Sequence, residues 1–267
     1  MTRPIITLTT DFGVGSPYVA AMKGVILSIN PAANIVDLSH AIRPQDIRGG
    51  ALAIDEAGRW FPPGTIHVAV VDPGVGSERR IVLLLARGHA HIGPDNGLLS
   101  RLALAPGGST IIHLNRAEFW LPNVSATFHG RDIMAPVAAR LSLGVAPETL
   151  GEPLDALIPF SWSEASVSVG KIEGVVQSID SFGNLITNIT ADALEKTPRG
   201  PDDVRIECDE HETCGIFRAY SDQPEMTLIA LVGSDGRLEL AIVGDSAAMM
   251  LGVRVGAPVR ITWGEAK

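Results

Sequence analysis

The chain has 267 residues, of which 46% are hydrophobic and 19% charged, with a formal net charge of −9. This composition is typical of a globular protein rather than a disordered one. A net negative chain repels a phosphate backbone, which argues against a nucleic-acid partner. The longest apolar runs, such as residues 81–86, are too short to span a bilayer. We therefore expect no nucleic-acid or membrane partner.

The apolar run near the N-terminus is too short for a signal sequence and is followed at once by Asp11. The chain has only two cysteines, Cys208 and Cys214. Without a secretory context, two cysteines in a chain of this size indicate free thiols in a reducing compartment. A cytoplasmic protein is therefore expected.

The first half of the chain alternates predicted strands and helices. Strands are expected at residues 5–10, 34–38, 65–71, 81–86, 89–92 and 110–114. Helices are expected from Pro17, with Ser16 as the N-cap, from Asp46 to Trp60, and after Gly130. This alternation predicts an α/β domain over residues 1–155, with helices flanking a mainly parallel sheet.

The second half changes character after a Pro-rich join at residues 151–164. From Ser166 onward the pattern becomes short strands without clear helices, at 166–179, 185–189, 204–208, 215–220, 227–232, 237–243 and 259–263. Turn sequences such as DSFGN and GSDG separate these strands. Residues 165–267 are therefore predicted to form a smaller, antiparallel β-barrel-like domain.

Two acidic residues stand where predicted parallel strands end. Asp11 follows the first strand and Asp72 the third, and each precedes glycines. Ligands of parallel α/β sheets bind beyond the carboxyl ends of the strands, where such an acid can accept hydrogen bonds from sugar hydroxyls or hold a cation. Either acid alone is explained equally well as a turn cap. The occurrence of both favours a functional site.

Arg79 and His129 are the candidate partners of these acids. Arg79 lies seven residues beyond Asp72 and pairs with it if the loop folds back; otherwise it is a solvated surface charge beside Arg80. His129 precedes a predicted helix and could act as an acid or a base, although most of the seven histidines are expected to be inert.

Three familiar patterns are present only in part. The DFG of residues 11–13 lacks the other kinase motifs, and neither GVG extends to a nucleotide-binding glycine loop. Asp11, Asp72, His129 and Asp132 could form a metal site, but no closely spaced ligand pair accompanies them. We expect no metal and no cofactor.

Two turns of the second half carry candidate binding residues. In DSFGNLITN, Phe182 is either a core residue or a platform for a flat ring. Asn184 offers a donor and an acceptor, as an adenine edge requires, but also suits a tight turn. Ser234 in GSDGRLELAIV either contacts a ligand or shapes its hairpin.

Six motifs in register form a familiar combination: TTDFG, VVDPGVGSERR, GPDNGLL, FHGRDIMAPVAA, DSFGNLITNI and GSDGRLELAIV. Together they closely resemble the S-adenosyl-L-methionine (SAM) hydrolases, also called SAM hydroxide adenosyltransferases, which are relatives of the fluorinase and chlorinase. The resemblance covers nearly the whole chain. It implies conversion of SAM and water to adenosine and L-methionine by attack at the ribose C5′. It also implies a homotrimer with sites between subunits.

The resemblance also implies roles for individual residues. Asp72, Arg79 and His129 would make or orient the nucleophile, and Asp11 would bind the ribose hydroxyls. The implied contacts of the adenine and the rest of the ligand are Asn184, Ser234, Glu239 and Ile242. Asp180 would receive the methionine ammonium. Phe182 and a second aromatic, Tyr220 or alternatively Phe217, would stack on the adenine.

Two alternatives remain open. A SAM-dependent halogenase is expected to carry Tyr, Thr and Trp where this chain has Asp72, Val75 and Gln45. Because a carboxylate at position 72 repels a halide ion, the sequence favours water as the nucleophile. A non-catalytic SAM or adenosine sensor would not need the set of Asp72, Arg79 and His129, which therefore favours an enzyme.

Overall fold

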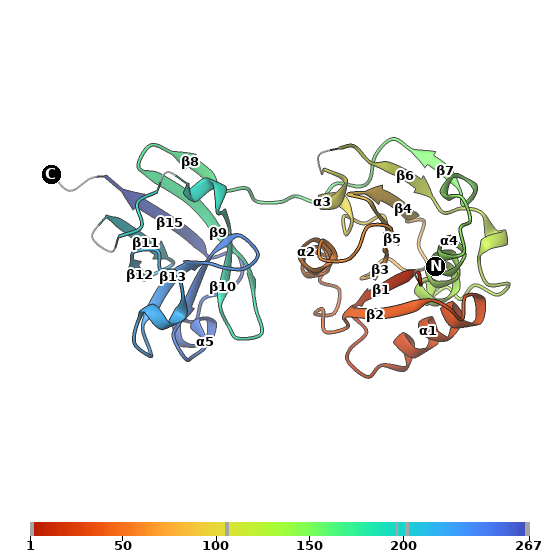
Figure 1. Ribbon diagram of the computed structural model, residues 1–267, viewed down its shortest axis with the longest axis horizontal. Helices are drawn as coiled ribbons and strands as arrows, with labels where there is room; N and C mark the ends of the chain where they lie inside the picture. The colour runs from red at the N-terminus through yellow and green to blue at the C-terminus, as the bar shows by residue number, and fades with distance from the viewer. Residues whose placement is uncertain (1–2, 105–106, 196, 201–202, 265–267) are drawn as a thin grey trace. The chain divides into compact units, whose positions relative to one another are not determined.

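The computed structural model describes residues 3–104, 107–195, 197–200 and 203–264. The chain divides into two compact units, Met1–Phe160 and Ser161–Lys267 (Figure 1). Each has its own sheet and its own apolar core. The predicted class, an α/β domain followed by a smaller antiparallel β domain, is confirmed. None of the described helices is long and apolar enough to cross a membrane.

The first unit contains a seven-stranded sheet in the order β2-β1-β3-β5-β4-β6-β7. Its strands are β1 (Ile5–Thr10), β2 (Asn34–Ser39), β3 (Ile66–Val70), β4 (Ile81–Ala86), β5 (His89–Pro94), β6 (Thr110–His113) and β7 (Glu152–Leu154). The parallel arrangement expected from the sequence is found over β2-β1-β3-β5. The remaining pairs are antiparallel, so the sheet is mixed.

The tight turn between β4 and β5 causes this change of direction. Arg87 and Gly88 both have positive φ, of 54° and 77°. Two such residues suit a two-residue hairpin, which joins antiparallel neighbours, whereas a parallel pair needs a long crossover. As a result β5 lies between β3 and β4, although β4 comes first along the chain.

Helices cover both faces of this sheet. They are α1 (Pro17–Ile29), α2 (Ile47–Gly58), α3 (Ser100–Ala103) and α4 (Ala135–Ser142), the last preceded by a π-helical turn, η2 (Gly130–Met134). Figure 1 shows α1 and α4 on one face and α2 and α3 on the other. The predicted caps are confirmed, because Ser16 Oγ accepts from the Tyr18 amide and Asp46 Oδ1 accepts from the Gly49 amide.

Three histidines form an unusual polar cluster on the α2 side of the sheet. His67 of β3 stacks on His91 of β5 with ring centroids 5.0 Å apart, and His89 lies 5.1 Å from His67. Burial, reinforced by the neighbouring imidazoles, lowers the pKa of His67 to about 4 and that of His91 to about 3. Thr7 Oγ1 contacts His67 Nδ1 at 2.7 Å.

This cluster makes the stability of the first unit sensitive to acid. The unfolded histidines titrate near pH 6.5, above their folded pKa values, so below that pH the unfolded state binds more protons. Stability is therefore fully present above about pH 6.5 and falls as the pH drops toward 4. The expected loss is on the order of a few kcal/mol, and urea unfolding between pH 8 and 4 measures it.

His91→Gln removes one titrating group and is expected to flatten this pH dependence. His113→Gln on β6, outside the cluster, is the matched control and is expected to keep the wild-type slope. An unchanged slope in His91→Gln would show that the acid sensitivity has another origin.

The second unit is a nearly closed antiparallel barrel. Its strands are β8 (Ser166–Ser168), β9 (Lys171–Ile179), β10 (Leu185–Thr190), β11 (Val204–Cys208), β12 (His211–Cys214), β13 (Leu228–Val232), β14 (Arg237–Ile242) and β15 (Pro258–Trp263). The order is β12-β11-β15-β9-β10-β14-β13, with β8 beside β9. Thr213 Oγ1 donates to the Leu228 carbonyl at 2.7 Å, which brings the two edge strands together.

One predicted strand of this unit is wrong. Residues 215–219 form a loop with a single isolated bridge, between Phe217 and Leu231, and Tyr220 begins a short 3-10 turn, η5 (Tyr220–Asp222). Asp222 Oδ2 accepts from the amides of Arg218 and Ala219 and holds this loop out of the sheet. A short helix, α5 (Ala247–Leu251), was also not expected. Cys208 and Cys214 are free thiols, as predicted.

Candidate active site

The two predicted acids lie at the same edge of the first sheet. β1 and β3 are parallel neighbours with Thr10 beside Val70, so Asp11 and Asp72 both follow the carboxyl ends of adjacent strands. Asp11 Oδ2 accepts the Gln45 amide at 2.8 Å. Gln45 has a φ of 65°. This edge is where α/β sheets bind ligands.

Arg79 connects Asp72 and His129 through one guanidinium group. Its Nε donates to both carboxylate oxygens of Asp72, at 2.7 and 2.8 Å, and Nη2 donates to Oδ2 as well. The same Nη2 lies 2.8 Å from His129 Nδ1. The side chains of Asp72 and Arg79 are only 4% and 8% exposed. The loop therefore folds back, and Arg79 is a buried partner rather than a surface charge.

These contacts determine the protonation state of the imidazole. A guanidinium has N–H donors and no acceptor, so Nδ1 of His129 must accept the hydrogen bond from Arg79. The neutral ring then carries its proton on Nε2. Burial, followed by the charge of Arg79, lowers the pKa of His129, and the charges of Asp72 and Asp132 oppose this shift. The site therefore favours a neutral His129 with Nε2–H as a donor.

Close packing places His129 at the end of β3. Gly130 follows it in η2, and a Cβ there would lie only 3.2 Å from Val70 Cγ2. Phe128 precedes it and packs edge-to-face on Phe12, with ring centroids 5.7 Å apart. The loop after β1 and the loop that carries His129 are thus in direct contact.

Two further contacts hold the loop before His129. Asp132 is fully buried, and its Oδ2 accepts the Ser125 amide at 2.9 Å. Gly76 has a φ of 81°, and a Cβ on it would lie 2.3 Å from the Ala126 carbonyl oxygen. Only glycine fits there, since both the conformation and the space exclude a side chain. The loop after β3 therefore packs directly on the loop that leads to His129.

Asp180 of the second unit organises its own turn. Oδ1 accepts from the amides of Phe182 and Asn184, both at 2.9 Å, and Oδ2 accepts from Asn184 Nδ2 at 2.9 Å. Asn184 is buried, whereas the Phe182 side chain is 77% exposed. Phe182 is therefore not a core residue, and its ring is available to stack on a ligand.

Tyr220 and Glu239 form the second polar group of this unit. The Tyr220 hydroxyl donates to Glu239 Oε1 at 2.5 Å. Burial raises the pKa of Glu239, and the charges of Asp180 and Asp235 raise it further, against the lowering effect of the Tyr220 hydrogen bond. The structure thus brings Asp180, Tyr220 and Glu239 together.

The other two predicted residues of the hairpin are separated from this group. Ser234 is exposed in the turn between β13 and β14. Ile242 lies in the apolar cluster inside the barrel with Leu238 and Leu240. Because its side chain packs in the core, Ile242 can contact a ligand only through its backbone.

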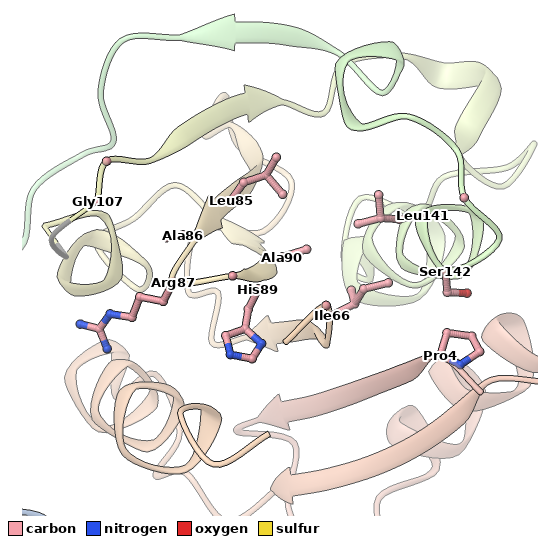
Figure 2. A pocket seen from close by; sticks show the side chains of 14 residues that line it. Pro4, Ile66, Leu85, Ala86, Arg87, His89, Ala90, Gly107, Leu141 and Ser142 are labelled. Atoms are coloured by element: carbon pink, nitrogen blue, oxygen red, sulfur yellow. The ribbon is translucent and has the colours of Figure 1, made fainter. Parts of the chain in front are cut away.

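A cavity of about 660 Å³ lies at the opposite end of β3 from Asp72 (Figure 2). Its lining includes Pro4, Ile66, His89 and Leu141. These residues are near the amino end of the parallel strands, away from the predicted site. Among the described residues, no group of three or more His, Cys, Asp or Glu side chains is arranged to hold a metal ion.

Asp95 and Asn96, which directly follow β5, contact both ends of the loop that carries Asp72, and sequence reasoning did not assign them a role. The sequence did contain a signal, because the GPDN motif ends a predicted strand with two polar residues. The sequence does not give the strand order, however, and therefore could not show that β5 lies beside β3, the strand that leads to Asp72.

The fold is that of a two-domain α/β protein in which Asp72, Arg79 and His129 are in contact at the carboxyl edge of the first sheet. Residues 6–151 match the model of the SAM hydroxide adenosyltransferase N-terminal domain, and residues 174–260 match that of the C-terminal domain. The chain belongs to the SAM hydroxide adenosyltransferase family.

Individual relatives cover the whole length. The chain is 39% identical over 271 residues to the (R)-S-adenosyl-L-methionine hydrolase of Thermus thermophilus, covering 97% of this chain and 99% of the relative. A crystal structure of an uncharacterised conserved protein from Thermotoga maritima superimposes with a TM-score of 0.91 at 34% identity, covering 96% and 99% of the two chains. The fluorinase of Actinopolyspora mzabensis is more distant, with 28% identity over 291 residues and 97% of each chain covered.

Proposed function

We propose that this protein hydrolyses SAM to adenosine and L-methionine. The observation that carries this proposal is the buried Arg79 fork, which joins Asp72 and His129 at the edge where α/β sheets bind ligands. Full-length relatives named (R)-SAM hydrolases support the substrate class. Their names specify the (R) form at sulfur, and we extend that preference to this chain.

The proposed reaction is an in-line displacement at the ribose C5′. The water oxygen forms a bond to C5′ as the C5′–S bond breaks, and the bonding pair returns to sulfur to give the neutral thioether of methionine. Because the sulfonium charge disappears on the way to products, a site that excludes water favours the step. Alignment of water with the C–S bond supplies a further part of the acceleration.

Asp72 is the proposed acceptor of the water proton. A carboxylate has about four lone-pair sites, so the three contacts with Arg79 leave room for a hydrogen bond from water. His129 cannot take the proton while Nδ1 accepts from Arg79, because its only other ring nitrogen is already protonated. We therefore assign His129 the role of a donor that orients the water oxygen through Nε2–H.

The remaining proposed roles concern substrate binding. Asp11 would bind the ribose hydroxyls with the lone pairs that the Gln45 amide leaves unused. In the second unit, the adenine would stack on Phe182 and Tyr220. The adenine and the rest of the ligand would also be held by Asn184, Ser234, Glu239 and the backbone of Ile242. Asp180 would receive the methionine ammonium. The homotrimer implied by the resemblance is also a proposal, and light scattering of the purified protein tests it.

The deciding experiment is incubation of the purified protein with (R)-SAM and (S)-SAM in separate reactions. Chromatography should show equal amounts of adenosine and methionine, formed faster from the (R) form. Saturable adenosine binding without turnover would instead identify a sensor. Formation of 5′-chloro-5′-deoxyadenosine that depends on added chloride would identify a halogenase, which the Asp72 carboxylate disfavours.

His129→Gln tests the donor role. Glutamine supplies an N–H donor but no base, so its turnover should stay within about tenfold of wild type, whereas loss of a general base costs roughly 10²–10⁴-fold. The alanine variant, with no donor, should be slower than the glutamine variant. A His129→Gln enzyme as inactive as the alanine variant would contradict the donor assignment.

The pH profile gives an independent check on the same residue. Protonation of His129 removes the acceptor that Arg79 needs and adds a like charge beside it. Since the pKa of His129 is lowered, wild-type activity should fall only below about pH 6.5. The Gln variant should lack this acidic decline.

A further inference from the structure

The GPDN segment, residues 93–96, lies directly beneath the loop that carries the proposed catalytic residues. That loop leaves β3 at Val71 and enters β4 at Ile81, and β5 lies between these two strands. The loop must therefore pass over the carboxyl end of β5. Asp95 and Asn96 are the first two residues beyond that end.

Asn96 holds the first end of the loop. Its Nδ2 donates to the Val71 carbonyl at 3.0 Å, and its Oδ1 accepts the Leu98 amide at 3.2 Å. The second contact defines which way the amide group is turned, so that the N–H₂ end faces the loop. Val71 is the residue before Asp72, and the peptide group whose oxygen Asn96 holds is the one that leads into Asp72.

Asp95 holds the second end. Its backbone amide donates to the Arg80 carbonyl at 2.9 Å, and its Oδ2 accepts from Arg80 Nε at 2.8 Å. Oδ1 accepts the Ile158 amide at 2.7 Å, so both carboxylate oxygens are in use. The Asp95 side chain is 1% exposed. Arg80 follows Arg79, so these contacts hold the residue next to the one that carries the guanidinium fork.

We propose that Asn96 and Asp95 are positioning residues that clamp the two ends of the loop and thereby set the geometry of Asp72 and Arg79. This inference rests on the proposed function for its kinetic consequence, but its structural part does not. Apart from the bonds between Arg79 and Asp72, the contacts inside the loop are short-range turns, such as Val75 N to Asp72 O at 3.2 Å. Such turns hold the loop's shape but do not fix its ends to the sheet.

The test is Asn96→Ala, with Ser100→Ala as the matched control. Ser100 Oγ donates to the Gly97 carbonyl at 2.7 Å, in the same turn, and is buried, but this bond does not involve the loop. Asn96→Ala removes the donor to the Val71 carbonyl and the acceptor of the Leu98 amide, whereas Ser100→Ala removes the donor to the Gly97 carbonyl, so both variants lose hydrogen bonds of the same turn. The two variants therefore differ mainly in whether the loop loses its anchor.

For Asn96→Ala we expect kcat to fall about 10- to 100-fold with KM changed less than about threefold, because misplacement of reacting groups lowers the chemical step. Ser100→Ala should keep wild-type kcat. Asn96→Asp should resemble the alanine variant, since a carboxylate oxygen facing the Val71 carbonyl cannot donate. Wild-type kcat in Asn96→Ala, or an equal loss in Ser100→Ala, would overturn the proposal.

A second measurement separates this inference from the proposed function. Hydrogen–deuterium exchange of peptides spanning residues 72–80 needs no turnover. It should become at least about fivefold faster in Asn96→Ala and stay unchanged in Ser100→Ala, since only the first loses an anchor of the loop. If the wild-type chain does not hydrolyse SAM, the proposed function fails. The hydrogen–deuterium exchange measurement then tests by itself whether Asn96 anchors the loop. Unchanged exchange in Asn96→Ala would refute the clamp.

Discussion

Asp72→Ala is expected to lower SAM hydrolysis by about 10³-fold or more while adenosine affinity stays within about threefold of wild type. The carboxylate is the proposed proton acceptor, and its loss also releases the Arg79 fork that it orients. Groups that act as one unit lose most of their effect when one member is removed. Adenosine binding rests on other proposed residues, so calorimetry should show it preserved.

The alanine variant also leaves a buried guanidinium without its partner. Breaking a buried ion pair in this way costs about 3–5 kcal/mol, so the protein could lose activity by unfolding. Asp72→Asn keeps the shape of the side chain and two of its polar atoms, and should be folded yet equally inactive. Near-wild-type turnover in a folded Asp72→Asn protein would exclude the assigned role.

Asp55→Asn is the matched control for the ion pair. Asp55 lies on α2, its side chain is 14% exposed, and it pairs with Arg87 and Arg101. Arg87 lines the cavity at the opposite edge of the sheet. The Asp55→Asn variant should be less stable than wild type but keep its kcat. A loss of kcat in this control would mean that damage to an ion pair elsewhere in the unit is enough to stop turnover.

Arg79→Lys is expected to lower kcat by about 10²-fold or more although the charge is kept. An ammonium group is a compact point charge, whereas the planar guanidinium contacts both Asp72 oxygens and His129 Nδ1 at once. Lysine cannot maintain all three contacts from one position. If charge alone mattered, the lysine variant would remain close to wild type.

Chemical rescue tests the same point in Arg79→Ala. Added guanidinium at millimolar concentration should restore part of the lost kcat, and added ammonium should restore less, because only the first reproduces the fork. Arg87→Lys, which alters the partly exposed pair with Asp55, is the control and should keep wild-type kcat. Equal rescue by both cations would show that the fork geometry is unimportant.

Local sequence patterns were sufficient to predict most of the elements and the place of two candidate residues at the edge of the sheet. Continuous runs of apolar and β-branched residues located β1, β3 and β4, and the Ser16 and Asp46 caps marked where α1 and α2 begin. Asp11 and Asp72 could be assigned to one edge of the sheet because a buried parallel strand must end before a charged residue, and parallel strands end at the same edge. These inferences depend only on neighbours along the chain.

The strand at residues 215–220 shows where such patterns fail. Its composition suits a strand, but Asp222 captures two backbone amides that a ladder would need. Competition between a side chain and the sheet for the same donors depends on three-dimensional position, and propensity does not include it.

By itself, the amino-acid sequence determined the two-domain α/β and β organisation, the acids at the strand ends and, through six motifs in order, the resemblance to a family. Only the tertiary structure decided that Arg79 is buried between Asp72 and His129, and that Asp95 and Asn96 lie beneath that loop. The physical reason is that the β4–β5 hairpin inserts β5 beside β3. Periodicity records which face of an element is buried, but not which distant strand becomes its neighbour.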